Sequence, residues 1–118
     1  MDELKTISTE QLQQRLAQDT NFHFWNVLTD GYFKGEMIPG SRRVPLDTIG
    51  HDVSEAQPSK GEEIVVYCGG PTCPQSLQAA RKLTDLGYTN VRAYEGGLEE
   101  WKNGGNKIEH AKQRAAQY

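Results

Sequence analysis

The chain has 118 residues, of which 36% are hydrophobic and 25% are charged, and its formal net charge is -3. This length predicts one domain with its own hydrophobic core, and the slightly acidic balance argues against the basic surface of a nucleic-acid-binding protein. No apolar run is long enough to span a membrane, and there are only two cysteines, so we expect a cytoplasmic protein without a disulfide framework.

The first element is predicted to be a short helix. Ser8 and Gln11 have the spacing of a capping box, which predicts that a helix covers residues 9–17. Leu12 and Leu16 lie four residues apart and would form its inner face.

The next segments alternate between extended and turn-forming sequence. Residues 22–27 are rich in aromatic and β-branched side chains and predict a strand. We expect a short helical turn over residues 32–37 and a turn at the Ile-Pro-Gly-Ser sequence of residues 38–41. Residues 42–45 predict a brief strand closed by proline, and residues 49–61 a polar loop with room for one helical turn.

The second half of the chain has clearer signals. Residues 64–67 form a continuous apolar run, the pattern of a strand that is buried on both faces. Residues 75–86 predict the longest helix, and residues 91–94 predict another strand. A last helix is expected over residues 98–102, and residues 106–118 are expected to form a helical or frayed tail. The longest helix has apolar residues at helical spacing: Leu77, Ala80, Leu83 and Leu86.

Strands alternate with helices along the chain, which predicts one α/β domain with a parallel central sheet. Cys68 follows the apolar run directly and so lies at the carboxyl end of a strand, where such sheets bind ligands. A loop rich in glycine and proline and then a helix N-terminus come next, and both favour an anion, so we expect a lowered thiol pKa. The alternative is that Cys68 is a small buried hydrophobic residue at a strand end.

Four sequence blocks occur in an order that resembles the single-domain rhodaneses of the sulfurtransferase superfamily. They are Asn-Val-Leu at 26–28, Ile-Pro-Gly-Ser at 38–41 before Val44-Pro45, Val-Val-Tyr-Cys at 65–68, and Glu-Gly-Gly at 95–97 before Trp101. The resemblance implies a three-layer sandwich with a five-stranded, mainly parallel sheet flanked by helices. It assigns residues 1–105 to this domain and leaves residues 106–118 as the tail. It also implies that Cys68 is the catalytic residue and carries a persulfide sulfur.

The departures from the family pattern concern charged groups. Asn26 and Leu28 stand where the family usually has an aspartate and an arginine, and Met37 replaces the usual histidine. The catalytic loop usually ends in an arginine five positions after the cysteine, where this chain has Cys73. The loop is also about two residues longer than usual, and resembles that of a subgroup with Gly-Pro and a second cysteine here.

The loop after Cys68 is expected to bind the anionic sulfur group through its backbone N–H groups. For Thr72, Gln75 and Ser76 the alternative is helix capping. The charges of Arg42 and Arg43 either reach this pocket or lie solvated on the surface. A Cys-x4-Cys pair supplies too few ligands for a structural zinc site, so we expect no metal and no cofactor. The expected anion- or substrate-binding loop is Gly69, Gly70, Pro71, Thr72, Cys73, Pro74, Gln75 and Ser76.

Cys73 has three interpretations. It can attack a Cys68 persulfide, release sulfide and leave a Cys68–Cys73 disulfide for a thiol reductant to reopen. It can be a reactive thiol at the helix N-terminus, or an inert residue in the place of the arginine.

The resemblance implies a sulfurtransferase that moves sulfane sulfur from thiosulfate or a persulfide to a thiol acceptor, either a small molecule or a protein. We expect no nucleic-acid or membrane partner. The alternative is a non-catalytic redox-sensing or protein-interaction module in which Cys68 and Cys73 switch between dithiol and disulfide. A phosphatase or arsenate reductase is disfavoured, because those enzymes need the loop arginine.

Overall fold

A sheet of five parallel strands forms the centre of the computed structural model, which describes residues 5–18, 22–56 and 58–110. The strand order across the sheet is β1-β6-β5-β2-β4. This arrangement confirms the predicted fold class. The strands are β1 Lys5–Thr6, β2 His23–Asn26, β4 Arg42–Arg43, β5 Ile64–Tyr67 and β6 Val91–Tyr94.

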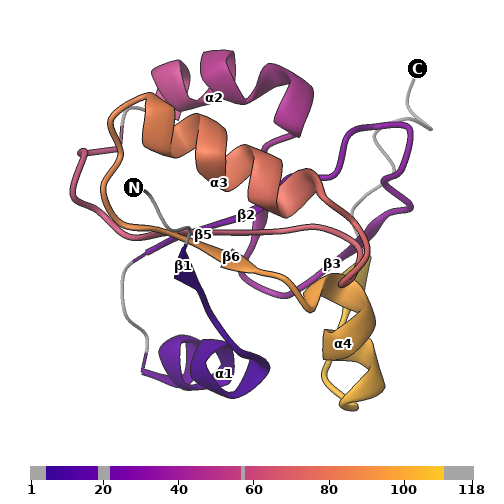
Figure 1. The fold of residues 1–118 in the computed structure, drawn as a ribbon. Helices are drawn as coiled ribbons and strands as arrows, with labels where there is room; N and C mark the ends of the chain where they lie inside the picture. The colour runs from indigo at the N-terminus through magenta and orange to yellow at the C-terminus, as the bar shows by residue number, and fades with distance from the viewer. Residues whose placement is uncertain (1–4, 19–21, 57, 111–118) are drawn as a thin grey trace.

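Helices cover both faces of the sheet and complete the three-layer sandwich. Figure 1 shows α2 and α3 on one face and α1 and α4 on the other. None of the helices in the described ranges has the length and apolar character to cross a membrane. The helices are α1 Thr9–Ala17, α2 Ile49–Ala56, α3 Gln75–Asp85 and α4 Gly97–Asn103, with a 3-10 turn, η1, at Leu46–Thr48.

The strand β5 is the most deeply buried of the sheet, and all of its residues have 0% exposure. It pairs with β2 on one side and β6 on the other, so its backbone is satisfied within the sheet. The hydroxyl of Tyr67, its last residue, accepts a hydrogen bond from the Ile38 N–H (3.0 Å) and lies 2.7 Å from the Ser41 hydroxyl. The strand is therefore tied to the Ile-Pro-Gly-Ser turn, whose Gly40 has a φ of 92°.

Several local predictions are confirmed. The capping box of α1 is present, because the Gln11 N–H donates to the Ser8 hydroxyl (3.1 Å) and the Ser8 N–H donates to the Gln11 side chain (3.0 Å). The helix α3 ends at Asp85 with Leu86 as its C-cap, and the following Gly87 has a positive φ of 102°. Leu86 itself is 45% exposed, so its expected place on the apolar face is wrong.

Two local predictions differ from the structure. The segment 32–37 is not a helical turn, because its last two residues form strand β3, Glu36–Met37, which pairs antiparallel with β7, Glu109–His110. The segment 49–61 contains the complete helix α2 and not a loop with one helical turn. Ile49 and Val53, one turn apart, are buried and give this helix an apolar face. Within the expected tail, residues 109–110 form the strand β7. Residues 111–118 lie outside the described residues.

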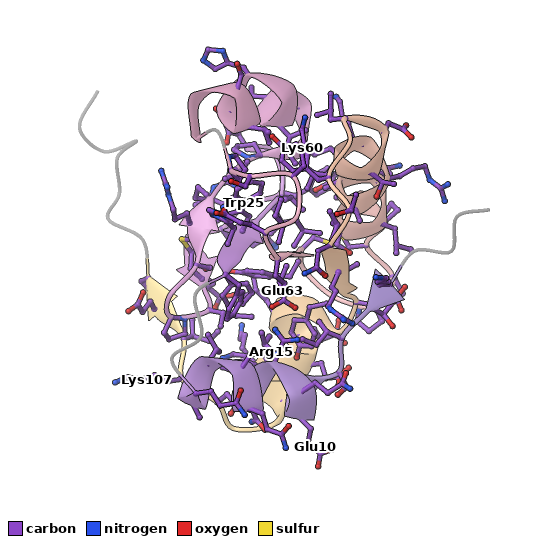
Figure 2. All side chains as sticks on the ribbon, turned by 90° about the vertical axis from the view of Figure 1, so that its left-hand side faces the viewer. Glu10, Arg15, Trp25, Lys60, Glu63 and Lys107 are labelled. Atoms are coloured by element: carbon purple, nitrogen blue, oxygen red, sulfur yellow. The ribbon has the colours of Figure 1, made fainter. Side chains whose placement is uncertain are left out.

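At the amino-terminal end of β5, a buried carboxylate binds two arginines. Glu63, with a side chain only 10% exposed, forms an ion pair with Arg15 of α1. Figure 2 shows these two side chains pointing toward each other. The Arg92 Nε lies 3.2 Å from the other Glu63 oxygen without hydrogen-bond geometry, so this second contact is Coulombic. This cluster holds α1, β5 and β6 together at the amino-terminal end of the sheet, opposite the end at which Cys68 lies.

Candidate active site

Cys68 directly follows β5, the middle strand of the sheet. Because all strands of this sheet are parallel, the loops after them gather at one edge, which is where α/β sheets bind ligands. Figure 1 shows β5 leading at this edge into α3, with α4 on the other face of the sheet. Cys68 is only 1% exposed, so its thiol lies beneath the surface of this edge.

The start of α4 holds the first residues of the loop by its backbone. The Leu98 N–H donates to the Cys68 carbonyl (3.0 Å), and the Glu99 N–H donates to the Gly69 carbonyl (2.8 Å). Gly97, with a φ of +60°, allows this approach, because a β-carbon there would lie 2.5 Å from the Cys68 carbonyl oxygen. The Gly-Gly turn is therefore architectural, as its sequence suggests.

The middle of the loop folds over the Cys68 thiol. The Cys73 N–H donates to the Gly70 carbonyl (3.0 Å) and closes a turn. The Cys68 thiol donates to the carbonyl of Cys73 at 3.3 Å. Pro71 and Thr72, at the tip of the turn, are exposed. The loop thus places the Cys73 carbonyl, a hydrogen-bond acceptor, against the Cys68 sulfur.

The electrostatics of Cys68 reverse the prediction for its pKa. Burial raises the pKa of the Cys68 thiol, and the hydrogen bond and charge of the neighbouring Cys73 side chain raise it further. The backbone N–H and the hydroxyl of Ser76, which favour the thiolate, lower the pKa by less. The expected lowering is wrong, because desolvation outweighs the donors that the helix N-terminus provides.

The N-terminus of α3 is also connected to the loop after β2. The Thr29 N–H donates to the Gln75 side-chain oxygen (3.1 Å), and the Gln75 amide donates to the Thr29 hydroxyl (3.2 Å). Pro74 is the N-cap residue of α3, and Ser76 is 1% exposed. The structure therefore brings the predicted loop residues 69–76 together, but Gln75 is engaged in an architectural contact.

A cavity of about 660 Å³ opens beside the loop. Its walls come from Leu28 and Tyr32 after β2, Glu36 of β3, Cys73 of the loop and Lys102 of α4, among others. This volume is in the range of small-molecule binding sites, about 300–1,000 Å³. Cys73 lines the cavity, whereas Cys68 lies behind it and is not among the residues that form its walls.

The charges of the cavity come from residues that the sequence did not single out. The Lys102 ammonium binds both oxygens of Glu36, at 3.0 and 2.8 Å. Lys34 and Glu99 also line the cavity, and Lys34 has no ion pair among the described residues. No local signal marks these residues, because the loop after β2, β3 and α4 bring them together only in the fold.

Of the two alternatives for Arg42 and Arg43, the described structure does not favour a place in the cavity. Arg42 is exposed, and neither residue lines the cavity. The Arg43 guanidinium donates to the Leu28 carbonyl and to Asp30 (2.7 Å) and lies 4.0 Å from the centre of the Phe33 ring. These contacts hold the loop after β2, and no arginine is found among the described residues that line the cavity.

The histidines are not gathered at the site. His23 lies 2.6 Å from Glu62, before the amino-terminal end of β5. Over the parts of the chain that the structure describes, no group of three or more His, Cys, Asp and Glu side chains has the arrangement to hold a metal ion.

Comparison with known proteins finds a matching family, a curated relative and solved structures of similar fold. The sequence profile of the Rhodanese-like domain family matches residues 8–104. Over 78 residues the chain is 31% identical to thiosulfate sulfurtransferase PspE of Escherichia coli (strain K12), which covers 66% of this chain and 72% of PspE. The crystal structure of the BH2092 protein from Bacillus halodurans has a TM-score of 0.80 and 25% identity, and covers 90% of this chain and 77% of that one. The human single domain sulfurtransferase TSTD1 shares the fold, with a TM-score of 0.70 and 24% identity over 86% of this chain and 97% of that one.

Proposed function

Because this chain belongs to the Rhodanese-like domain family, we propose that it is a sulfurtransferase whose Cys68 carries the transferred sulfur. The observation that supports this role is the position of Cys68. It follows the central strand, in a loop held by α4 on one side and by the N-terminus of α3 on the other, next to the cavity.

The reaction needs a thiolate and two successive attacks on sulfur. The Cys68 thiolate attacks the outer sulfur of the donor, the donor's sulfur–sulfur bond breaks, and sulfite or a thiolate leaves with the electron pair. A persulfide then stands on Cys68. The thiolate of an acceptor attacks its outer sulfur, and Cys68 leaves as the thiolate while the acceptor becomes a persulfide.

The arrangement around Cys68 is a resting state of this cycle. The proton of the thiol is held by the Cys73 carbonyl at 3.3 Å. When Cys68 loses this proton, the contact turns repulsive, because a carbonyl oxygen then faces an anion. Among the described residues, the bond from the Cys73 N–H to the Gly70 carbonyl closes the turn, and we expect deprotonation of Cys68 to favour movement of residues 70–73 away from the sulfur.

The charges of the cavity favour a persulfide over thiosulfate as the donor. The two lysines and two glutamates that line it cancel, and Lys102 is already engaged by Glu36. Thiosulfate is a dianion and needs a compensating cation when it leaves water. A persulfide of a small thiol needs less compensation, and about 660 Å³ leaves room for its remaining groups.

The test compares the wild type, Cys68→Ser and Cys73→Ser with thiosulfate and with 2-hydroxyethyl persulfide, whose carbon part is uncharged, as donors. We expect the wild type to transfer sulfur, faster from the persulfide, and Cys68→Ser to transfer none. Intact mass should show one added sulfur on Cys73→Ser. Equal activity of all three proteins would contradict the proposal. Disulfide formation under mild oxidant, without any sulfur transfer, would favour a redox-sensing module instead.

A further inference from the structure

The sulfur carrier proposed above has a second thiol beside it, and the two differ in access. Cys68 is 1% exposed and absent from the cavity wall, while Cys73 is partly exposed and lines the cavity. Both are free thiols. A molecule that enters the cavity therefore meets Cys73 before it can reach a sulfur on Cys68.

The backbone keeps these two residues in contact. The Cys68 thiol donates to the carbonyl of Cys73 itself, and the Cys73 side chain is close enough to act on Cys68 through a hydrogen bond and its charge. The Cys68 end of the loop is fixed by α4 and the Cys73 end by the start of α3. The two sulfurs are thus held within one short turn and do not need to find each other by diffusion.

We infer that Cys73 resolves the persulfide on Cys68 and releases the transferred sulfur as hydrogen sulfide. This inference rests on the proposed role of Cys68. It assigns Cys73 as a further catalytic residue, and it makes sulfide a product of the protein in the presence of a thiol reductant.

The step balances without an external oxidant. The Cys73 thiol gives its proton to the outer sulfur of the Cys68 persulfide, and the resulting Cys73 thiolate attacks the inner sulfur. A Cys68–Cys73 bond forms, and the bond to the outer sulfur breaks. The electron pair of that bond leaves with hydrosulfide, so the sulfane sulfur is reduced while the two cysteine sulfurs are oxidised to a disulfide. A dithiol then reduces the disulfide and restores both thiols.

Two features favour attack on the inner sulfur. Hydrosulfide is a less basic leaving group than the Cys68 thiolate, which attack on the outer sulfur would expel, and the less basic thiolate leaves faster. The loop tip, Pro71 and Thr72, is exposed, so the turn can move to align the two sulfurs while its ends stay bound.

The experiment is a single turnover without acceptor. The protein is fully reduced, freed of reductant, and mixed with one equivalent of N-acetylcysteine persulfide. Released sulfide is measured, and the protein is analysed by intact mass and peptide mapping. Cys73→Ser and Cys73→Ala are the matched variants, with circular dichroism to verify that each is folded.

We expect the wild type to release about one sulfide per chain and to lose the mass of two hydrogens. Treatment with a dithiol should restore that mass. The Cys73 variants should keep one extra sulfur on Cys68 and release no sulfide. A wild type that retains the extra sulfur, on Cys68 or on Cys73, would overturn the inference while leaving the sulfurtransferase intact. If neither Cys73 variant takes up sulfur on Cys68, the proposed function itself fails, and the inference with it.

Discussion

Gly97 lies directly against the backbone of Cys68, with room for a hydrogen and for nothing larger. A β-carbon on Gly97 would lie 2.5 Å from the Cys68 carbonyl oxygen and 2.8 Å from the Gly70 nitrogen. Both of these are backbone atoms, which cannot rotate away as a flexible side chain can. The position of the candidate nucleophile is therefore set from the opposite side of the sheet, by the first residue of α4.

Gly97→Ala should displace the loop and slow sulfur loading onto Cys68. Its positive φ of 60° adds strain of about 1–3 kcal/mol for any residue with a side chain. Urea unfolding measures the loss of stability, and intact mass after persulfide treatment measures the loading. Gly105→Ala is the control, because Gly105 has a φ of +81° but nothing within 4 Å of a β-carbon. Equal loading by the two variants would show that the close contact does not matter.

The alkylation of Cys68 should begin at a higher pH than that of an ordinary cysteine. Only a thiolate is alkylated, and burial, followed by the Cys73 side chain, raises the pKa of Cys68. In Cys73→Ser, alkylation of Cys68 by iodoacetamide should increase with a midpoint above that of an ordinary cysteine, since burial remains. Peptide-resolved mass spectrometry measures the rates. A midpoint below the ordinary value would mean that the N–H donors outweigh desolvation.

The same shift predicts how the folded state responds to alkali. A raised pKa means that the fold favours the protonated thiol of Cys68. This contribution to stability is therefore fully present below the pKa of an unfolded cysteine, and is lost as the pH rises through the raised value. Cys68→Ser should unfold with a weaker pH dependence than the wild type over that interval, as urea titrations at a series of pH values would show.

Tyr67→Phe should destabilise the fold through a lost hydrogen bond. The Tyr67 hydroxyl accepts from the buried Ile38 N–H at 3.0 Å, and an unsatisfied buried donor costs about 1–3 kcal/mol. Urea unfolding measures this cost. Tyr88→Phe is a matched control, because Tyr88 is 7% exposed and no hydrogen bond of its hydroxyl is found among the described residues. A comparable loss in both variants would mean that the hydroxyl's partners do not account for the effect.

Glu63→Gln should destabilise the fold at the amino-terminal end of the sheet, opposite the end at which Cys68 lies. It would leave the guanidinium groups of Arg15 and Arg92 without their carboxylate. Each arginine is about 30% exposed, so water screens part of the effect, and we expect about 1–3 kcal/mol and not the larger loss of a fully buried pair. The exposed neighbour provides the control, since Glu62→Gln should change the free energy of unfolding little. Sulfur loading should persist in both variants.

The sequence predicts best those elements whose signal is local. The apolar run of β5, the capping box of α1 and the glycine after α3 each depend on residues within a few positions, and the structure confirms them. Strands β3 and β7 are missed because two residues near position 36 pair with two near position 110. No local pattern encodes such a distant ladder, and β3 carries Glu36 into the cavity wall.

The sequence predicts which residues form the loop at the site, but not how their backbone groups are oriented. Residues 69–76 come together as the Gly/Pro-rich loop suggests, yet which backbone atom faces the Cys68 sulfur depends on a turn whose carbonyl points inward. The sequence also left open whether Arg42 and Arg43 reach the pocket, because the answer depends on how the strands pair. The pairing of β4 with β2 directs Arg43 to the loop after β2, and the lysines of the cavity become visible only when α4 and β3 are placed beside each other.

The hydrogen bonds from α4 to the Cys68 and Gly69 carbonyls have a consequence for how such a loop diversifies over evolutionary time. Since these bonds fix where the loop begins, and the first turn of α3 fixes where it ends, residues gained or lost between them can be accommodated without altering the core. Changes of length are thereby channelled into the segment that carries Cys73. New chemistry can arise there by insertion, while the position of Cys68 and the scaffold stay the same.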